Sequence, residues 1–450
     1  MRGTMPLAKP APIEVLLSPF NRFFRTSAAG GLVLVACTAA AMIWANSPFG
    51  ASYERFREIH FSVGAGGATL SLSFLHWVND GLMAVFFFVV GLEIKREILV
   101  GELSSTRKAM LPLAAAFGGM CVPAIIYLGF NWGESAVRGW GIPIATDIAF
   151  TLGVLSLLGR RVPQSLKVFL TALAIADDIG AVLVIALFYG AQINWLSLGL
   201  GLVVLAAMAG ANALGVRRVL VFLLMGTAAW LFFFSSGIHA TVAGVLAAMT
   251  IPARPRYDLD VFFRHARGVL DESQIIREKG GRGMLDSLRQ HKLLLSLRES
   301  CRDAETPLQR LDALLHPWVA FGIMPLFALV NGGVVLSGDL WQALTHNLSL
   351  GVMLGLALGK PIGVCLATLG MIRSGLALEL QGVTLRHLLG AGCLAGIGFT
   401  MSIFVAGLAF GGAEETKLAK VAILIGSLVS AIVGWFVLRG LPETGPAANL

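Results

Sequence analysis

The chain has 450 residues, of which 56% are hydrophobic and only 13% are charged. Soluble domains carry about 25% charged residues, so this composition excludes an ordinary water-soluble protein and indicates that lipid is the solvent. The net charge of +8 does not indicate nucleic-acid binding, because the basic residues cluster at the ends of apolar segments. The five cysteines are scattered, without metal-binding or redox spacing, and are interpreted as packing residues.

The apolar segments predict an all-α polytopic membrane protein. A spanning helix needs roughly 20 mainly apolar residues, and twelve segments meet this description. They divide the chain into a cytoplasmic N-terminal segment (1–25) without a cleavable signal, a first membrane portion (26–251), a charged loop (252–315), a second membrane portion (316–440) and a tail (441–450). The predicted spans are 26–46, 73–94, 109–130, 138–158, 166–189, 195–214, 217–235, 237–251, 316–335, 346–372, 385–410 and 418–438.

Basic residues set the expected orientation. They fall on the N-terminal segment and on every second connection after it, which predicts an inner-membrane protein with both termini in the cytoplasm. This alternation also supports separating the seventh and eighth spans, which are short and divided only by a weak Ser-Ser-Gly break. The basic connections carry Lys95, Arg96, Arg107 and Lys108; Arg160, Arg161 and Lys167; Arg217 and Arg218; and Arg373 and Arg386.

Two regions outside the spans attract attention. Residues 61–74 contain two short alternating stretches around a glycine-rich turn, typical of a β-hairpin, with a flexible loop as the alternative. An open hairpin edge can pair with a second copy, so a homodimer is an expected arrangement. Residues 254–310 carry mixed charges and fit either a partly helical cytoplasmic insertion or a disordered loop.

Two consecutive acids stand in the middle of the fifth predicted span. Asp177 and Asp178 lie among apolar residues, and neighbouring carboxylates in a low-dielectric interior cannot both ionise cheaply without a cation nearby. Such a pair can hold protons or a hard cation such as Na⁺, and the two compete for the same oxygens. The pair therefore predicts exchange of a metal cation for protons; a polar contact between helices is the simpler alternative.

Two spans are interrupted by helix-breaking residues. Gly141 and Pro143 precede Thr146 and Asp147 in the fourth span, so backbone groups become free at membrane depth beside an acid. A plain proline kink is the alternative. A glycine-rich stretch, 389–404, interrupts the eleventh span in the same way. Paired interruptions of this kind, one in each part of a transporter, point to the binding site.

A lysine within the tenth span also needs an explanation. Lys360 follows about fourteen mainly apolar residues, so snorkelling to the surface is a weak alternative and a carboxylate partner, Asp177 or Asp178, is expected. If that carboxylate leaves the lysine to bind Na⁺, the uncompensated lysine is favoured to lose its proton. Glu93 and His239 are less informative. A surface charge cluster explains Glu93 equally well, and a neutral structural role explains His239 as well as pH sensing does.

Rival functions fit less well. An intramembrane aspartyl protease needs two acids facing each other from separate helices, whereas consecutive helical residues diverge by about 100°. The sequence around Lys360 lacks the spacing and the Ser or Thr of a phosphate loop, so no ATP-driven pump is indicated. A channel favours rings of weak ligands rather than one dense site. An antiporter for K⁺ or for a cationic drug stays open as an alternative.

Seven segments resemble the NhaA-type Na⁺/H⁺ antiporters of bacteria, in order and across nearly the whole membrane portion. This family is itself one of the examples behind the rule that links interrupted helices to transport sites. The segments are GLEIKRE (91–97), ATDIAFTLGVLSLLG (145–159), RVPQSLKVFLTALAIADDIGA (161–181), SGIHATVAGV (236–245), HPWVAFGIMPLFAL (316–329), LGKPIG (358–363) and GIGFTMSIF (396–404).

The resemblance implies a transporter, not an enzyme, with inverted repeats, two broken crossing helices and no cofactor beyond the transported Na⁺ and H⁺, with Li⁺ as a further substrate. It implies pH regulation and a role in sodium extrusion. No catalytic residues are implied. Asp177 and Asp178 would carry Na⁺ and protons, Asp147 and Thr146 would support the site, and Lys360 would pair with Asp177. Glu93, His239 and Asp312 would serve the pH response or the access of cations; the family commonly has Glu at the last position.

Overall fold

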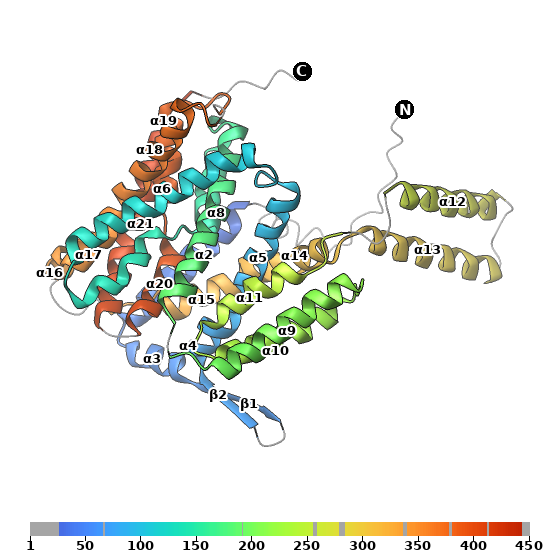
Figure 1. Ribbon diagram of the computed structural model, residues 1–450, viewed down its shortest axis with the longest axis horizontal. Helices are drawn as coiled ribbons and strands as arrows, with labels where there is room; N and C mark the ends of the chain where they lie inside the picture. The colour runs from blue at the N-terminus through green and yellow to red at the C-terminus, as the bar shows by residue number, and fades with distance from the viewer. Residues whose placement is uncertain are drawn as a thin grey trace.

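The computed structural model describes residues 27–65, 68–190, 192–254, 259–278, 284–335, 340–377, 380–411 and 414–442. The predicted N-terminal segment, 1–25, and most of the tail lie outside these residues. The described chain forms a bundle of helices with one small sheet at one end (Figure 1). The first-half helices are α2 (Ser27–Ala45), α3 (Gly50–Glu58), α4 (Phe74–His76), η1 (Trp77–Leu82), α5 (Met83–Val100), α6 (Thr106–Asn131), η2 (Ser135–Ile144), α7 (Ile148–Leu157), η3 (Gly159–Arg161), α8 (Gln164–Phe188), α9 (Trp195–Ala213), α10 (Val219–Phe234) and α11 (Ala240–Thr250).

The described residues of the second half form helices joined by turns and short irregular stretches, without a strand. Three short π-helical turns, η1, η4 and η5, lie within longer helical runs. The second-half helices are α12 (Leu259–Glu278), α13 (Met284–Ala304), α14 (Pro307–Trp318), η4 (Val319–Ile323), α15 (Met324–Asn331), α16 (Leu340–Thr345), α17 (Asn347–Leu354), η5 (Gly355–Gly359), α18 (Lys360–Arg373), α19 (Leu385–Ala395), α20 (Phe399–Phe410) and α21 (Glu414–Arg439).

Each of the twelve predicted spans coincides with helical structure. Length and composition alone identify six membrane-crossing helices, or up to nine when bent pairs count as one span. The other three predicted spans fall on α5, which carries four charged residues between Glu93 and Glu97, and on α10 and α11, which are short. Large apolar side chains point outward from the bundle, such as Phe117 (66% exposed) and Leu187 (74% exposed), as expected where lipid is the surrounding medium.

The predicted β-hairpin is present. Strands β1 (His60–Ala65) and β2 (Ala68–Ser73) pair antiparallel, with Ser62 opposite Ser71 and their hydroxyl oxygens 2.9 Å apart. The indole of Trp77 donates to the carbonyl of Phe61 at 3.1 Å and ties the hairpin to η1. The hairpin projects from the end of the bundle opposite the labels of α18 and α19 (Figure 1).

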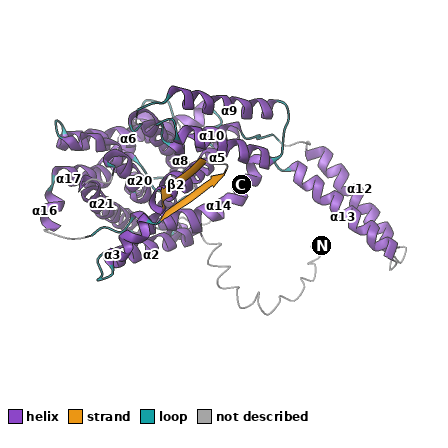
Figure 2. Cartoon of the chain, turned by 90° about the horizontal axis from the view of Figure 1, so that it is seen from below, coloured by secondary structure: helices purple, strands orange, loops and turns teal. Residues whose placement is uncertain are grey.

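The charged loop contains two helices, so the helical alternative is right for its described residues. Helices α12 and α13 lie side by side and project away from the bundle (Figures 1 and 2). His265 Nε2 lies 3.1 Å from Ser296 Oγ between them. Where the chain leaves and returns, the amide of Leu308 donates to the carbonyl of Pro252 at 3.2 Å. The insertion therefore begins and ends at one point of the bundle.

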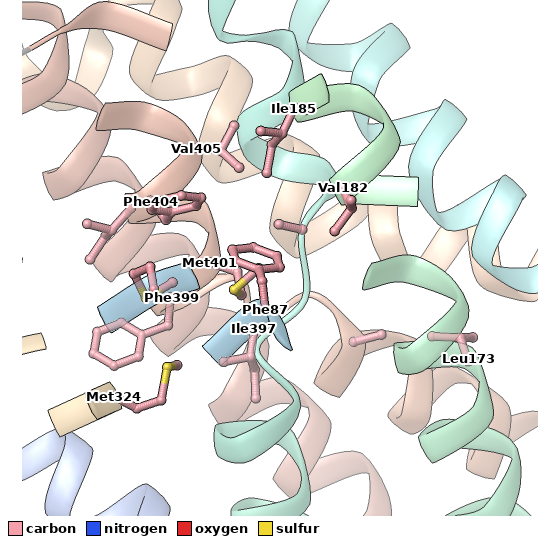
Figure 3. Packing of buried hydrophobic residues seen from close by; sticks show 14 of the residues in the cluster. Phe87, Leu173, Val182, Ile185, Met324, Ile397, Phe399, Met401, Phe404 and Val405 are labelled. Carbon is pink, nitrogen blue, oxygen red and sulfur yellow. The ribbon is translucent and has the colours of Figure 1, made fainter. Parts of the chain in front are cut away.

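Close helix contacts fix the interior. Helices α6 and α18 approach so closely that a Cβ on Gly363 would lie 2.1 Å from the carbonyl oxygen of Gly118. Only glycine allows two backbones to come this near. Near the centre of the bundle, Phe87 packs with Met401 and Phe404 of α20, close to Val182 and Ile185 of α8 (Figure 3). This packing surrounds the place where two helices are broken.

Candidate ion site between two broken helices

The two consecutive acids lie inside an unbroken helix. Asp177 and Asp178 are in the middle of α8, and their residues are only 1% and 2% exposed. Because neighbouring helical residues point about 100° apart, the two carboxylates meet different partners. The distribution of those partners decides what each acid can do.

Asp177 has its charge compensated inside the protein. Its Oδ2 accepts a hydrogen bond from Lys360 Nζ and lies 2.5 Å from the hydroxyl oxygen of Thr146. The expected contact between Lys360 and one of the two acids is therefore confirmed, with Asp177 as the partner. The other oxygen of Asp177, Oδ1, is buried and has no hydrogen-bond partner among the described residues. That oxygen is free to accept a small cation or a proton.

Asp178 is the acid without a partner. None of the described residues makes a hydrogen bond or an ion pair with its carboxylate, although it lies within electrostatic range of Asp177, Glu93, Asp147 and Lys360. Burying a charged carboxylate in this way is costly unless a proton or a cation accompanies it. Asp178 is therefore the member of the cluster with the greatest need for an exchangeable ion.

Lys360 is held rigidly in place. The residue is fully buried and begins α18, directly after the π-helical turn η5. Such turns often occur at functional sites, because they re-aim the following side chain. The close α6–α18 contact described above lies one turn further along the same helix. The position of the ammonium group thus depends on the packing of α18.

Two interrupted helices cross beside these residues. Helix η2 bends by 42° into α7, and α19 bends by 44° into α20. The breaks are joined by backbone, since the amide of Asp147 donates to the carbonyl of Ile397 at 2.7 Å. Thr146 Oγ1 lies 2.8 Å from the carbonyl oxygen of Ala395, and the hydroxyl of Ser402 donates to Ile142 O at 2.7 Å. The freed backbone groups of each break are satisfied by the other.

The carboxylate of Asp147 lies at the N-termini of two half-helices, α7 and α20. Its Oδ1 accepts from the amide of Phe150 at 3.0 Å, as the N-cap of α7. Its Oδ2 accepts from the hydroxyl of Thr400 and, at 3.3 Å, from the Thr400 amide in the first turn of α20. Helix N-termini stabilise negative charge, so both half-helices favour an ionised Asp147. This acid is better compensated than Asp178.

The second break is tightly constrained. A Cβ on Gly396 would lie 2.3 Å from the carbonyl oxygen of Leu356, so only glycine fits at this crossing. Phe399 follows with φ of 22°, in a region that residues with a side chain rarely adopt. Such strained backbone persists only where the surroundings fix it, and it occurs most often at functional sites.

Glu93 and Asp312 belong to a second cluster at the other end of α5 from the hairpin. Asp312 Oδ2 accepts from Arg96 at 2.7 Å, and Glu93 Oε1 lies 3.5 Å from His316 Nδ1. One ligand atom each from Glu93, Asp312 and His316 lies within 4.8 Å of the others. The sequence analysis named the two acids but not His316. This histidine begins the motif at 316–329, and no other feature of the sequence marked it as part of a cluster.

His239 lies apart from that cluster. It caps the N-terminus of α11, with Nδ1 2.8 Å from Thr241 Oγ1 and Nε2 3.4 Å from Asp80 Oδ1. Glu93 is close to the opposite end of α11, where its neighbour Lys95 donates to the carbonyl of Met249. The sequence missed Asp80 although it is an ionisable residue within a predicted span. It also missed Thr400, whose signal was its place just after the second break.

Buried acids, a buried lysine and two crossing half-helices in an apolar helical bundle define the class of secondary ion transporters. Residues 21–438 match the family described as Na⁺/H⁺ antiporter 1. The chain belongs to this family and is a multi-pass membrane protein. The prediction made from the seven sequence motifs is thus confirmed.

Individual relatives agree with this assignment. The chain is 51% identical to the Na⁺/H⁺ antiporter NhaA of Oleidesulfovibrio alaskensis, over 97% of both chains. It is 48% identical to the NhaA antiporter of Koribacter versatilis, over 96% of this chain and 93% of that one. The solved sodium proton antiporter MjNhaP1 of Methanocaldococcus jannaschii aligns over 94% of this chain and 96% of its own, with 13% identity and a TM-score of 0.46.

Proposed function

We propose that this Na⁺/H⁺ antiporter works by competition between Na⁺ and protons for Asp177 and Asp178. The observation that carries the proposal is the buried carboxylate of Asp178, which has no partner among the described residues and stands beside the compensated Asp177. A site with one unpaired acid and one lysine-paired acid can bind a hard cation and release protons as it does so. No resident cofactor takes part; Na⁺ and H⁺ are the cargo.

The exchange cycle follows from the charges. Na⁺ arriving from one side replaces a proton on Asp178 and is also coordinated by the unpartnered oxygen of Asp177. Thr146 and Asp147 support the site. As Asp177 turns to the cation, Lys360 loses its partner charge and is favoured to release its proton. Movement of the broken helices against the rest of the bundle then exposes the loaded site to the other side. There, protons displace Na⁺.

Proteoliposomes test this site. A pH jump should drive Na⁺ across the membrane in wild type. Asp178→Asn should abolish the flux, because the neutral amide cannot release a proton and then bind a cation in its place. Asp271→Asn, on the exposed side of α12, is a matched control that should transport normally. Normal flux in Asp178→Asn would refute the proposed site.

Further properties extend the proposal. The site can accept Li⁺, which shares the preference of Na⁺ for carboxylate oxygens. If more than one proton is exchanged for each cation, the transport carries net charge and responds to membrane potential. The proton gradient would then drive sodium out of the cell and contribute to pH homeostasis. A current that accompanies exchange in a planar-membrane recording tests the charge imbalance.

The cluster around Glu93 is the proposed site of pH regulation. Asp312 and His316 of α14 face Glu93 and Arg96 of α5, so a change of protonation alters the contact between these two helices. Asp312→Asn should shift the pH at which exchange begins while leaving the maximal rate within about twofold of wild type. An unchanged pH profile would remove Asp312 from the regulation. His239, which lies at the hairpin end of the bundle, is the proposed residue for cation access.

The proposed location is the bacterial inner membrane, with both termini in the cytoplasm. The insertion that carries α12 and α13 then faces the cytoplasm as well. Cys301 on α13 is exposed, whereas the other four cysteines are partly or fully buried. A membrane-impermeant maleimide should therefore label everted vesicles but not intact spheroplasts, and Cys301→Ser should lose the label. Labelling of spheroplasts would reverse the orientation.

The hairpin of β1 and β2 is the proposed dimer contact. A two-stranded sheet leaves unpaired backbone groups along its outer edges, which a second copy can match. Replacing residues 61–72 by a short Gly-Ser linker should convert a dimer into a monomer in native mass spectrometry. A dimer that survives this change would place the contact elsewhere.

A further inference from the structure

A polar cavity opens at the hairpin end of the bundle. Its volume is about 380 Å³, and α3, η1, α15, α20 and α21 contribute to its lining. The proposed orientation places this end outside the cell. The cavity is lined by Glu54, Arg57, Leu75, His76, Asn79, Asp80, His239, Phe327, Asn331, Gly333, Val334, Val335, Ile403, Phe404, Gly407, Leu408, Gly411, Thr416, Lys417 and Lys420.

One helical turn separates a residue that lines this cavity from Thr400, which binds the carboxylate of Asp147. Phe404 lines the cavity and packs against Phe87 (Figure 3) and Phe327, with ring centres 5.5 and 6.1 Å apart. Four residues earlier on the same helix, Thr400 donates to Asp147. Residues four apart lie above one another on a helix, about one turn or 5.4 Å along its axis. The cavity therefore reaches to about one helical turn from the hydroxyl that binds Asp147.

Most charges around the cavity are paired. Glu54 accepts from Arg57 at 2.6 Å, and the carboxylate of Asp80 lies 3.4 Å from the imidazole of His239, a contact that pairs charges only when His239 is protonated. Lys417, at the rim, is 57% exposed and donates to Glu414 at 2.7 Å. These groups leave little free charge for a passing ion to meet.

Lys420 differs from all of them. It is only 8% exposed, stands one turn beyond Lys417 on α21, and has no hydrogen bond or ion pair with any described residue. The ion pair of Arg57 and Glu54 lies within electrostatic range. While Lys420 carries its proton, its ammonium group in this confined space repels another cation more strongly than an exposed one would, because less water screens it.

We infer that Lys420 lowers the affinity of the exchanger for Na⁺ on the hairpin side and so promotes release of Na⁺ there. The inference rests on the proposed function, since it concerns the path that leads to Asp178. A cation leaving the acids enters a space that already holds a positive charge, so returning to the acids becomes less favourable. Lys420 is thus a residue that sets the sidedness of the known exchange, without touching the bound ion.

Radioactive Na⁺ exchange at equal pH on both sides tests the inference, with vesicles of each orientation. Lys420→Gln should lower the KM for Na⁺ on the hairpin side by roughly threefold to tenfold, while the KM on the other side stays unchanged. Lys417→Gln is the matched control, since it removes the same charge one turn away but in water, and it should change neither value. Equal KM values for Lys420→Gln and wild type on the hairpin side, or equal shifts on both sides, would overturn the inference.

Two further variants separate charge from structure. Lys420→Arg keeps the charge and should retain the wild-type KM on both sides, whereas a merely structural role would be disturbed by the larger side chain. Asp80→Asn removes a negative charge from the same cavity and should raise the KM on the hairpin side; a fall would contradict the electrostatic account. If Lys420→Gln fails to fold, Asp80→Asn decides the question. Absence of exchange in wild type would instead defeat the proposed function.

Discussion

The three buried acids differ in how their negative charge is compensated, and this difference separates their roles. Asp147 accepts hydrogen bonds at the N-termini of two half-helices, and Asp177 forms an ion pair with the ammonium group of Lys360. Asp178 has neither kind of contact with the described residues. The free energy for taking up a cation or a proton is therefore most favourable at Asp178, while the other two acids hold the site in shape.

Removing Lys360 alone should destabilise the protein. Lys360→Met leaves Asp177 as an uncompensated buried charge, which costs about 3–5 kcal/mol of stability. Combining it with Asp177→Asn removes both charges and should recover most of that loss. Thermal unfolding in detergent at neutral pH measures both variants, and the double-mutant cycle isolates the pair. A double variant no more stable than the single one would show that the pair is not the source of the loss.

The hydroxyl of Thr400 should also matter for stability. Thr400→Val removes a hydrogen bond to the Asp147 carboxylate, and bonds to charged groups contribute about 1.5–3 kcal/mol. Thr368→Val is a matched control, because the buried hydroxyl of Thr368 has no partner among the described residues. Unfolding temperatures should fall for the first variant and stay or rise for the second. Equal effects would mean that Thr400 contributes only packing.

The residues alone showed which ionisable groups are costly in an apolar segment but left their partners open, and only the family resemblance named Asp177 as the partner of Lys360. Asp177, Asp178 and Lys360 stand out because each is an ionisable group in the middle of a span. The choice of Asp177 over Asp178 as the lysine's partner depends on helix rotation, which composition does not specify. Thr400 carries no charge, so only the crossing of the two breaks reveals its bond to Asp147.

At the scale of elements, the site depends on how closely helices approach each other. Proline and glycine in the sequence predicted both breaks, because these residues cannot continue a regular helical ladder. The hairpin was predictable from its alternating pattern. The π-helical turn before Lys360 was not predictable, since it arises from packing against neighbouring helices and has no pattern of its own.

The α6–α18 contact should be sensitive to a single methyl group. Gly363→Ala places a Cβ 2.1 Å from the carbonyl oxygen of Gly118, so the helices must move apart at a cost of about 1–3 kcal/mol. Because Lys360 lies one turn away, exchange activity should fall as well.

Gly370→Ala on the same helix is the control for this change. A Cβ there meets nothing within 4 Å, and alanine is the better helix former, so stability should be unchanged or higher. Unfolding temperature and Na⁺ flux in proteoliposomes measure both variants. A Gly363→Ala protein with wild-type stability would show that the two helices can separate without cost.

For the whole molecule, the alternation of basic connections and the count of apolar segments were enough to predict the helical membrane body. They were not enough for the segment between the two membrane portions. Residues 254–310 carry mixed charges without a membrane-like pattern, so helical and disordered states could not be separated from the sequence. The structure places α12 and α13 outside the bundle, packed mainly on each other.

The insertion should therefore be removable. The hydrogen bond between Leu308 and Pro252 shows that the bundle already brings the two ends together, so a short Gly-Ser linker in place of residues 256–304 can close the gap. The shortened protein should fold with a stability within about 1 kcal/mol of wild type and keep its Na⁺/H⁺ exchange. Thermal unfolding and proteoliposome flux check the two statements.

A slightly longer deletion is the control. Removing Thr306 as well takes away the capping box of α14, in which the Thr306 hydroxyl accepts from the amide of Gln309 at 3.1 Å. Loss of a helix cap costs about 0.5–2 kcal/mol, so this variant should be less stable than the first deletion. The cap also positions Asp312 two turns later, and the pH profile should shift with it. If instead the first deletion already abolishes exchange in a folded protein, α12 and α13 take part in transport and are not a removable appendage.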